Sequence, residues 1–414
     1  MKLLFKWLLL SLLPFASTVV FSKTIYVGKG KSFTSVQSGI NAAENGDTVV
    51  VGPGLYKEHD IKLNKRIYLK GDDYPVIDGE QKSGIFVIQA NGAVLDGFKI
   101  INGGRAETED LAGVLIENCY KVSVINNKLD NTNFGIYSQY SKSCTIKNNE
   151  IKAYGNNEVT SGNGIHCWRS DSLLIIGNKI AGHRDGLYFE FVTNSLIWRN
   201  QSRNNIRYGI HFMFSHHDTY ISNIFEGNAS GVAVMFTHHI QMYNNFFLDN
   251  WGGAAYGILL KEITDGIISG NYFSHNTIAI QMEGCNRNHI FKNSFTDNGW
   301  AIKVSASSIN NTISQNNFIS NTFDIGTNGT LVVNDFNGNY WDKYEGYDLN
   351  RDNIGDVPYH PVSMYSMIID SNPASLMLFR SLIVSLLDKS EKLLPGITPE
   401  NLEDETPLMR PLKL

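Results

Sequence analysis

The sequence is poor in charged residues. Asp, Glu, Lys and Arg make up 18% of its 414 residues, and the formal net charge is −5. A protein that binds nucleic acid needs a broad positive surface, so this balance argues against a nucleic-acid partner. The chain also lacks a nucleotide-binding loop. If its function uses ATP, a partner protein must bind and hydrolyse the nucleotide. Instead it is rich in Asn, Gly, Ser and aromatic residues, a composition typical of an all-β protein.

The first 22 residues have the pattern of a secretory signal peptide. Lys2 and Lys6 accompany an apolar run from Leu8 to Phe15, and small residues follow up to Ser22. We expect cleavage near Ser22 and export of the mature chain, which in a bacterium means the periplasm. The alternative interpretation is a membrane anchor that is retained.

A repeat of about 22 residues fills the centre of the chain. Most copies contain a Gly followed by an aliphatic residue, as in Gly209-Ile210 and Gly231-Val232, and an Asn about eleven residues later. Because the copies hold short apolar strands without a helical period, they predict an all-β fold, a parallel β-helix with coils about 4.8 Å apart. We expect the asparagines to stack in a ladder at one turn. They are Asn127, Asn149, Asn178, Asn200, Asn223, Asn245, Asn271, Asn293 and Asn316.

The repeat also sets the domain boundaries. The expected segments are a signal peptide (1–22), an N-terminal cap with the first coils (23–95), the repeats (96–340), a loop segment (341–371), and a C-terminal helix and tail for partner docking (372–414). The cap should contain a short helix that ends near Ala43. The Leu-rich C-terminal helix is too short, and too interrupted by Arg380, to cross a bilayer. It either closes the end of the β-helix or docks a partner, and insertions at 152–163 and 250–256 are candidate lips of a site.

Cysteine is scarce. An even number of cysteines in an exported protein can signal disulfides. The repeat, however, places the four cysteines at different points of different coils, so we expect free or buried thiols. They are Cys119, Cys144, Cys167 and Cys285.

One five-residue motif occurs twice, 22 residues apart: Met213-Phe-Ser-His-His217 and Met235-Phe-Thr-His-His239. Strand alternation sends Ile210 and Phe212 inward, so Met213 should point outward. In a β-helix with this period, Met213 and Met235 become neighbours on adjacent coils. His216 should then stack on His238, and His217 on His239.

This doublet is a candidate metal site. Imidazole with thioether is a soft to borderline ligand set, and thioethers select Cu(I), whereas zinc favours a closed site of thiolate, imidazole or carboxylate, and calcium favours oxygen. We therefore expect copper, bound transiently because the site would be open to solvent. The structural alternative is a plain histidine ladder, with the methionines packed on Phe214 and Phe236 or facing a protein partner. The candidate ligands are Met213, His216, Met235, His238, His211, His217 and His239.

A second cluster has the composition of a carbohydrate-active site. His183, Arg184, Asp185 and Glu190 lie along one coil, with Tyr188 outward, and such groups can perform acid–base work on a polysaccharide. A turn salt bridge between Arg184 and Asp185 is the structural alternative. A carbohydrate-binding or polysaccharide-cleaving β-helix is therefore the alternative to a metal-handling one.

A third cluster follows the repeats. Asp348, Asn350 and Asp352 alternate as oxygen ligands do in calcium loops, and Gly355 allows a tight turn. The Glu that closes such a loop in EF-hands is missing from its expected place. Calcium binding and an Asx-rich capping loop both stay open.

Three stretches resemble the NosD family of accessory proteins for nitrous oxide reductase maturation. They are residues 162–200, 207–223 and 339–359, and the second contains the motif HFMFSH, His211 to His216. The resemblance implies a right-handed β-helix in the periplasm without catalysis of its own. It would be held at the inner membrane by an ABC-type permease that has a cytoplasmic ATPase.

The resemblance further implies a role in supplying the copper–sulfur centre of nitrous oxide reductase, with a copper-chaperone lipoprotein as donor. Whether copper, sulfur or mechanical work is transmitted stays open. The C-terminal helix would then dock on the permease. Its candidate contact residues are Phe379, Leu382, Leu386 and Leu387.

Overall fold

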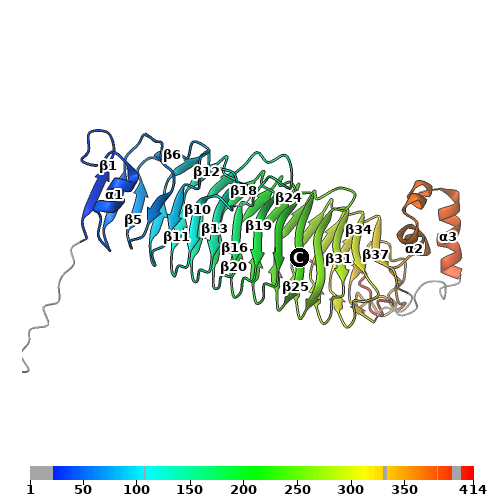
Figure 1. Ribbon diagram of the computed structural model, residues 1–414. Helices are drawn as coiled ribbons and strands as arrows, with labels where there is room; N and C mark the ends of the chain where they lie inside the picture. The colour runs from blue at the N-terminus through cyan, green and yellow to red at the C-terminus, as the bar shows by residue number, and fades with distance from the viewer. Residues whose placement is uncertain (1–21, 107–108, 330–332, 380, 394–401) are drawn as a thin grey trace, which may run out of the picture.

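The computed structural model describes residues 22–106, 109–329, 333–379, 381–393 and 402–414. The predicted signal peptide thus lies almost wholly outside the described residues. The described chain winds into three long parallel sheets of 14, 12 and 13 strands (Figure 1). Every third strand returns to the same sheet, which confirms the predicted right-handed parallel β-helix.

Each sheet runs almost the full length of the rod. The 14-stranded sheet extends from β1 (Thr24–Val27) to β38 (Asp335–Asn337). The 12-stranded sheet extends from β4 (Ile61–Leu63) to β37 (Phe323–Thr327), and the 13-stranded sheet from β3 (Leu55–Tyr56) to β39 (Tyr340–Trp341). Because the sheets close on one another around the lumen, one face of every sheet is buried.

Strand alternation fills the lumen with apolar side chains. In β22 (Tyr208–Met213), Ile210 and Phe212 are fully buried, while Met213 is half-buried on the outer face. A column of stacked rings continues from coil to coil, with centroids 4.1 to 5.4 Å apart. This column consists of Phe225, Phe247, Phe273, Phe295, Phe318 and Trp341. All four cysteines are buried and unpaired.

The predicted asparagine ladder is present at the turn after the 14-stranded sheet. The Nδ2 and backbone N–H groups of Asn200 both donate to Oδ1 of Asn223, over 3.0 and 2.9 Å. Asn223 repeats this arrangement with Asn245. A buried amide thus satisfies the backbone of its own turn and ties it to the next coil.

The N-terminal end is covered by α1 (Val36–Ala42), which ends near Ala43 as predicted. The hydroxyl of Ser35 caps this helix, and the Glu58 carboxylate accepts hydrogen bonds from the first helical N–H groups. Val36 and Ile40 pack into the open end of the lumen, where they are fully buried.

The C-terminal end is covered by the tail, residues 402–414. The Asp404 carboxylate takes the next position of the ladder and accepts hydrogen bonds from the backbone N–H and Nδ2 of Asn339, over 2.9 and 3.0 Å. It also accepts one from Nε1 of Trp341. Within the segment 372–414, expected to hold a helix and tail for partner docking, the tail residues 402–414 therefore lie in the end cap of the β-helix.

Between the last coil and the tail, the chain forms α2 (Met364–Ser371), the 3-10 helix η1 (Pro373–Leu378) and α3 (Leu382–Leu393), which stand out from the end of the rod (Figure 1). Tyr365 and Ile369 of α2 pack with Phe323 and Val384 in a small separate core. Lys303 of β34 (Trp300–Val304) forms an ion pair with Asp370. Among the helices that the structure describes, none has the length and apolar content to span a bilayer.

Candidate metal centre

Both histidine doublets lie at one corner of the β-helix, between the 12-stranded and 14-stranded sheets. β22 ends at Met213, the chain turns at Phe214 and His217, and β23 (Thr219–Ile221) begins. Both turn residues adopt positive φ, 49° and 60°. In the next coil, Phe236 and His239 repeat the turn with φ of 53° and 56°. The repeated motif therefore encodes the same corner twice.

The hydroxyl in each copy of the motif fixes this corner. Ser215 Oγ accepts a hydrogen bond from the Val192 N–H over 3.1 Å and donates to the Met213 carbonyl over 2.9 Å. Thr237 Oγ1 accepts from the Ser215 N–H over 3.3 Å and donates to the Met235 carbonyl. Since both hydroxyls are buried, they hold adjacent coils in register beneath the imidazoles.

The four imidazoles stack in two columns across the two coils. The rings of His216 and His238 are nearly parallel, 7° apart, with centroids separated by 3.8 Å. Those of His217 and His239 are 4.8 Å apart. His216 Nδ1 also accepts a hydrogen bond from the His238 backbone N–H over 3.3 Å. His216, on the preceding coil, therefore holds His238 in place through ring stacking and this hydrogen bond.

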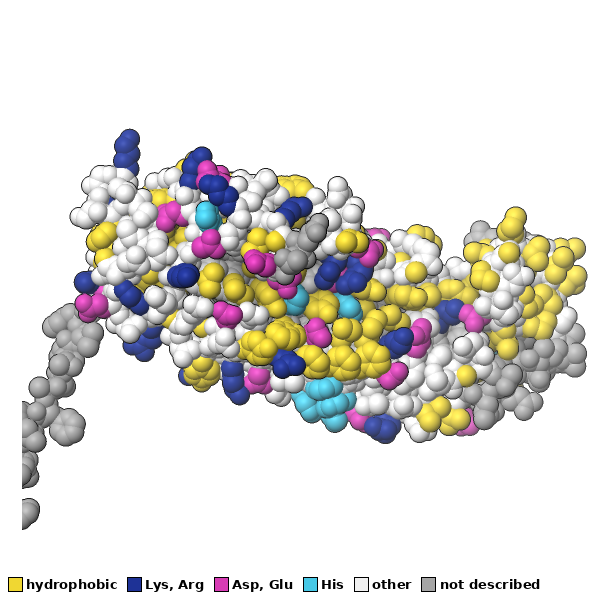
Figure 2. Space-filling model, in the orientation of Figure 1, with side chains coloured by type: hydrophobic (Ala, Val, Ile, Leu, Met, Phe, Trp, Pro, Cys, Tyr) yellow, Lys and Arg dark blue, Asp and Glu magenta, His cyan; other side chains and the backbone are white. Residues whose placement is uncertain are grey.

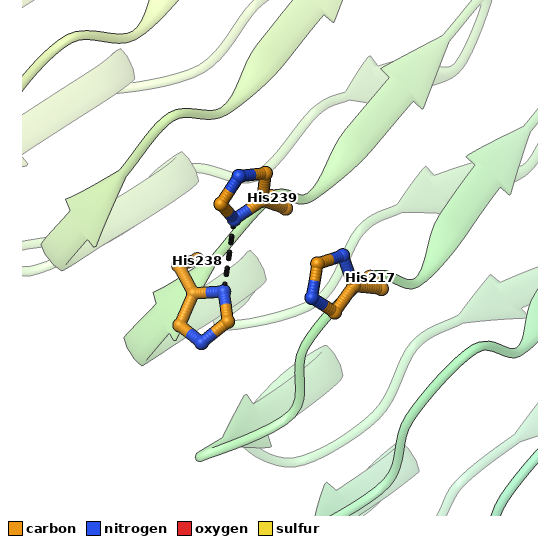
Figure 3. A group of neighbouring side chains, drawn as sticks. All are labelled: His217, His238 and His239. Carbon is orange, nitrogen blue, oxygen red and sulfur yellow. Dashed lines mark hydrogen bonds between the residues drawn. The ribbon is translucent and has the colours of Figure 1, made fainter.

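Three of these imidazoles converge at the surface (Figure 3). In His217, His238 and His239, one ring nitrogen each lies within 4.8 Å of the other two. Nδ1 of His238 and Nδ1 of His239 share a hydrogen bond of 2.9 Å. Imidazole binds a transition metal at about 2.0 Å, so two nitrogen ligands of one ion lie roughly 3–4 Å apart. The three nitrogens, all within 4.8 Å of one another, therefore lie close to the spacing that one ion requires.

The surroundings of His216 and His238 favour the neutral form of these two rings. Burial lowers the pKa of His216, and the neighbouring His238 lowers it further. Burial and the adjacent His239 likewise lower the pKa of His238. A neutral imidazole offers a lone pair to a metal, whereas a protonated one does not. Figure 2 shows the cluster at the surface, below a band of hydrophobic side chains.

Met213 and Met235 are direct partners in the register of the 12-stranded sheet, and both are half-buried. They precede the corner, and the histidines follow it. Next to them, Phe191, Phe214 and Phe236 form a parallel stack with centroids 5.3 and 5.2 Å apart. The sequence interpretation missed this ladder, although its members occupy one position of three successive repeats.

His211 lies apart from the triad, on the outer face of the 12-stranded sheet. Its ring contacts those of Tyr188 and Tyr208, and Nη2 of Arg207 lies 3.4 Å from its Nδ1. It is only 7% exposed. The structure thus joins His211 to the second cluster of the sequence rather than to the other histidines.

In that cluster, Asp185 is fully buried and paired with Arg207. Arg207 Nε donates to Asp185 Oδ1 over 2.9 Å, and its Nη2 donates to Oδ2. The Tyr208 N–H donates to the same carboxylate, and Arg184, the expected partner, lies 3.7 Å away. Sequence reasoning missed Arg207, which occupies the position of Arg184 one repeat later. With its oxygens engaged in this way, Asp185 ties two coils together.

The acidic loop after the repeats uses its oxygens internally. The Asp348 carboxylate accepts hydrogen bonds from the N–H groups of Asp352 and Asn353, over 3.2 and 2.9 Å. Asn350 Oδ1 accepts from the Asp352 N–H, and Asp352 Oδ1 from the Ile354 N–H. These Asx turns are the pattern of a capping loop. Calcium binding by Asp348, Asn350 and Asp352 stays a prediction.

The fold and this corner define a β-helical protein whose surface carries a cluster of three imidazoles with the spacing of a candidate metal site. The model of one protein family, described as periplasmic copper-binding protein (NosD), matches residues 40–160 and 152–346. The chain belongs to this family.

Two relatives extend the match over the greater part of the chain. Both are described as probable ABC transporter binding protein NosD. The protein from Pseudomonas aeruginosa is 28% identical over 403 residues, covering 84% of this chain and 85% of its own. The protein from Stutzerimonas stutzeri is 24% identical over 399 residues, covering 84% of each chain.

Solved structures share the fold alone. The catalytic unit of an α-1,3-glucanase from Streptomyces thermodiastaticus superposes with a TM-score of 0.57 at 14% identity, over 74% of this chain and 65% of that one. The Dettilon tailspike protein superposes with a TM-score of 0.55 at 13% identity, over 76% and 68%.

Proposed function

We propose that this protein is a non-catalytic periplasmic subunit that binds copper and passes it on for assembly of the copper–sulfur centre of nitrous oxide reductase. The convergence of His217, His238 and His239 carries the proposal, because it brings three imidazole nitrogens together at an exposed corner. The printed description of the family, a periplasmic copper-binding protein, supports copper as the metal.

The donor set suits transient binding of Cu(I). Three imidazoles suffice for low-coordinate copper, and the Met213–Met235 pair places two thioethers on the same coils. His217 and His239 are exposed, so a partner can reach the ion directly. In this proposal His216 positions His238 without binding the ion itself. Copper is then cargo rather than a resident cofactor.

The partners follow from the relatives' names and from the C-terminal helices. Both relatives are described as ABC transporter binding proteins, which supports attachment to an ABC-type permease whose cytoplasmic ATPase supplies the energy. Leu382 is 77% exposed and Leu386 55% exposed, while Phe379 is 40% exposed and Leu387 half-buried. Apolar side chains this exposed at the end of a rod fit a docking surface. A copper-chaperone lipoprotein would then deliver copper to the histidine corner.

A titration with Cu(I) against a competing chelator tests the metal site. His217→Ala and His239→Ala should each weaken the affinity at least roughly tenfold, because each removes one of three ligands. His289→Ala, an exposed histidine on the 14-stranded sheet, is the matched control and should bind as the parent does. Equal affinity in all four proteins would remove the proposed copper site.

A further inference from the structure

A cavity of about 790 Å³ separates the last coil of the β-helix from the helices at its end. This volume lies within the range of ligand pockets, roughly 300–1,000 Å³. Its walls come from three parts of the chain: β37, the loop of residues 343–361, and the helices α2 and α3. The aromatic and aliphatic residues that line it include Phe323, Tyr344, Tyr359, Tyr365, Phe379 and Val384.

Polar groups lie at the floor and the rim of this cavity. The buried Asp324 carboxylate accepts a hydrogen bond from Lys343 Nζ over 3.1 Å, and Lys343 also donates to the Asn321 carbonyl. These groups are therefore paired. At the rim, Nδ1 of His360 is buried without a hydrogen-bond partner among the described residues.

The helices beside the cavity expose apolar side chains, and the loop that contributes to its lining is rich in acidic residues. On the helical side, Met377 is 90% and Leu382 77% exposed, and Figure 2 shows hydrophobic side chains gathered over this end of the molecule. The loop of residues 342–356, which lines the cavity with residues that include Glu345, contains five acidic and two basic residues. The acidic residues are Asp342, Glu345, Asp348, Asp352 and Asp356.

We propose that this cavity receives an apolar side chain from a basic segment of the membrane partner. The inference rests on the docking role proposed above and names the site and the chemistry of the docked segment. An apolar anchor in a pocket, ringed by a polar rim, is the usual form of an interface hot spot. The acidic loop attracts Lys and Arg on such a segment, whereas it repels the anionic headgroups of a bilayer.

Two variants of the full-length chain test the proposal in co-purification with the permease and ATPase of its own assembly. Thr322→Trp fills the cavity mouth from an exposed position of the rim, and Glu345→Lys reverses one charge of the acidic wall. Loss of one anchor weakens an interface roughly 30-fold. We therefore expect Thr322→Trp to lose most of the permease and Glu345→Lys to lose part of it. Glu262→Lys, at an exposed acid in a distant coil, is the matched control and should retain it. Circular dichroism verifies folding.

The outcomes separate the cavity from the docking role itself. If the double variant Leu382→Ser/Leu386→Ser loses the permease and Thr322→Trp retains it, the cavity proposal is overturned while docking by α3 stands. If the double variant retains full recovery, the proposed docking function fails. Binding to phosphatidylglycerol vesicles that disappears in the double variant and is unchanged in Glu345→Lys would assign this end to a bilayer and overturn the proposal.

Discussion

Buried neutral histidines should make the β-helix sensitive to mild acid. Burial lowers the pKa of His166 to about 3 and those of His183 and His211 to about 4, from 6.5. In the unfolded chain each of them titrates near 6.5. Since folding lowers these pKa values, the unfolded chain binds more protons, and stability present above pH 6.5 is lost as the pH falls toward 4.

The size of this effect follows from the pKa values. A pH of 5 is 1.5 units below the pKa of a histidine in the unfolded chain. Each unit corresponds to about 1.4 kcal/mol, so each buried histidine lowers the free energy of unfolding by about 2 kcal/mol at this pH. Burial raises the pKa values of Asp218 and Asp324, and these carboxyls act in the opposite direction. The lowered pKa values of His216 and His238 add to the loss, so the net change in the parent protein differs from the sum of about 6 kcal/mol for three histidines, and a single-site variant is needed to isolate one contribution.

The variant His166→Phe isolates one contribution. The His166 ring packs between Tyr137 and Tyr188, with centroids 4.5 and 4.8 Å away, and a phenyl ring can retain both contacts. Loss of the hydrogen bond with Asn163 costs about 1 kcal/mol at every pH. Urea unfolding at pH 8, 6.5 and 5 should show that the variant loses about 2 kcal/mol less than the parent between pH 8 and 5. The same pH dependence in both proteins would refute the reasoning.

Two further predictions concern the end cap and the corner. Asp404→Ala should lower the free energy of unfolding by roughly 3–5 kcal/mol, because buried N–H groups of Asn339 and Trp341 lose their acceptor. Asp404→Asn keeps an acceptor oxygen and should cost less in urea unfolding, so equal losses would contradict this account. Thr237→Ala removes the acceptor of the Ser215 N–H and should weaken Cu(I) binding several-fold in calorimetric titration, while Thr237→Ser should restore it. Unchanged affinity in Thr237→Ala would show that the hydroxyl does not position the site.

The period of the sequence predicted the parts of the structure that repeat. A 22-residue spacing is enough to place Met213 beside Met235, because register in a parallel β-helix carries equivalent residues to equivalent places. It also predicted the asparagine ladder, whose amides need only that register to meet. Parallel strand pairing fixes the position of each coil relative to the next, so equivalent residues have little choice of position.

Features that depend on a single coil or on distant segments were not predictable in this way. His211 points outward from its strand as Met213 does, yet the rings of Tyr188 and Tyr208 cover it. Strand alternation predicts the direction of a side chain but not whether neighbouring side chains bury it. Asp404 completes the ladder from a point 65 residues beyond Asn339. Its segment lacks the repeat pattern, so the sequence offers no register for it.

The corner combines local strain with a rigid scaffold. Phe191, Phe214 and Phe236 adopt positive φ of 49° to 55°, a conformation that costs a bulky residue roughly 1–2 kcal/mol. Stacking of the phenyl rings and the buried hydroxyls of adjacent coils offset that cost. A turn fixed from several sides leaves the imidazoles that follow it little backbone freedom. If these histidines bind copper, folding has already placed His217 close to His238 and His239, so little conformational entropy is lost on binding. An exposed site of this kind can both hold an ion and release it.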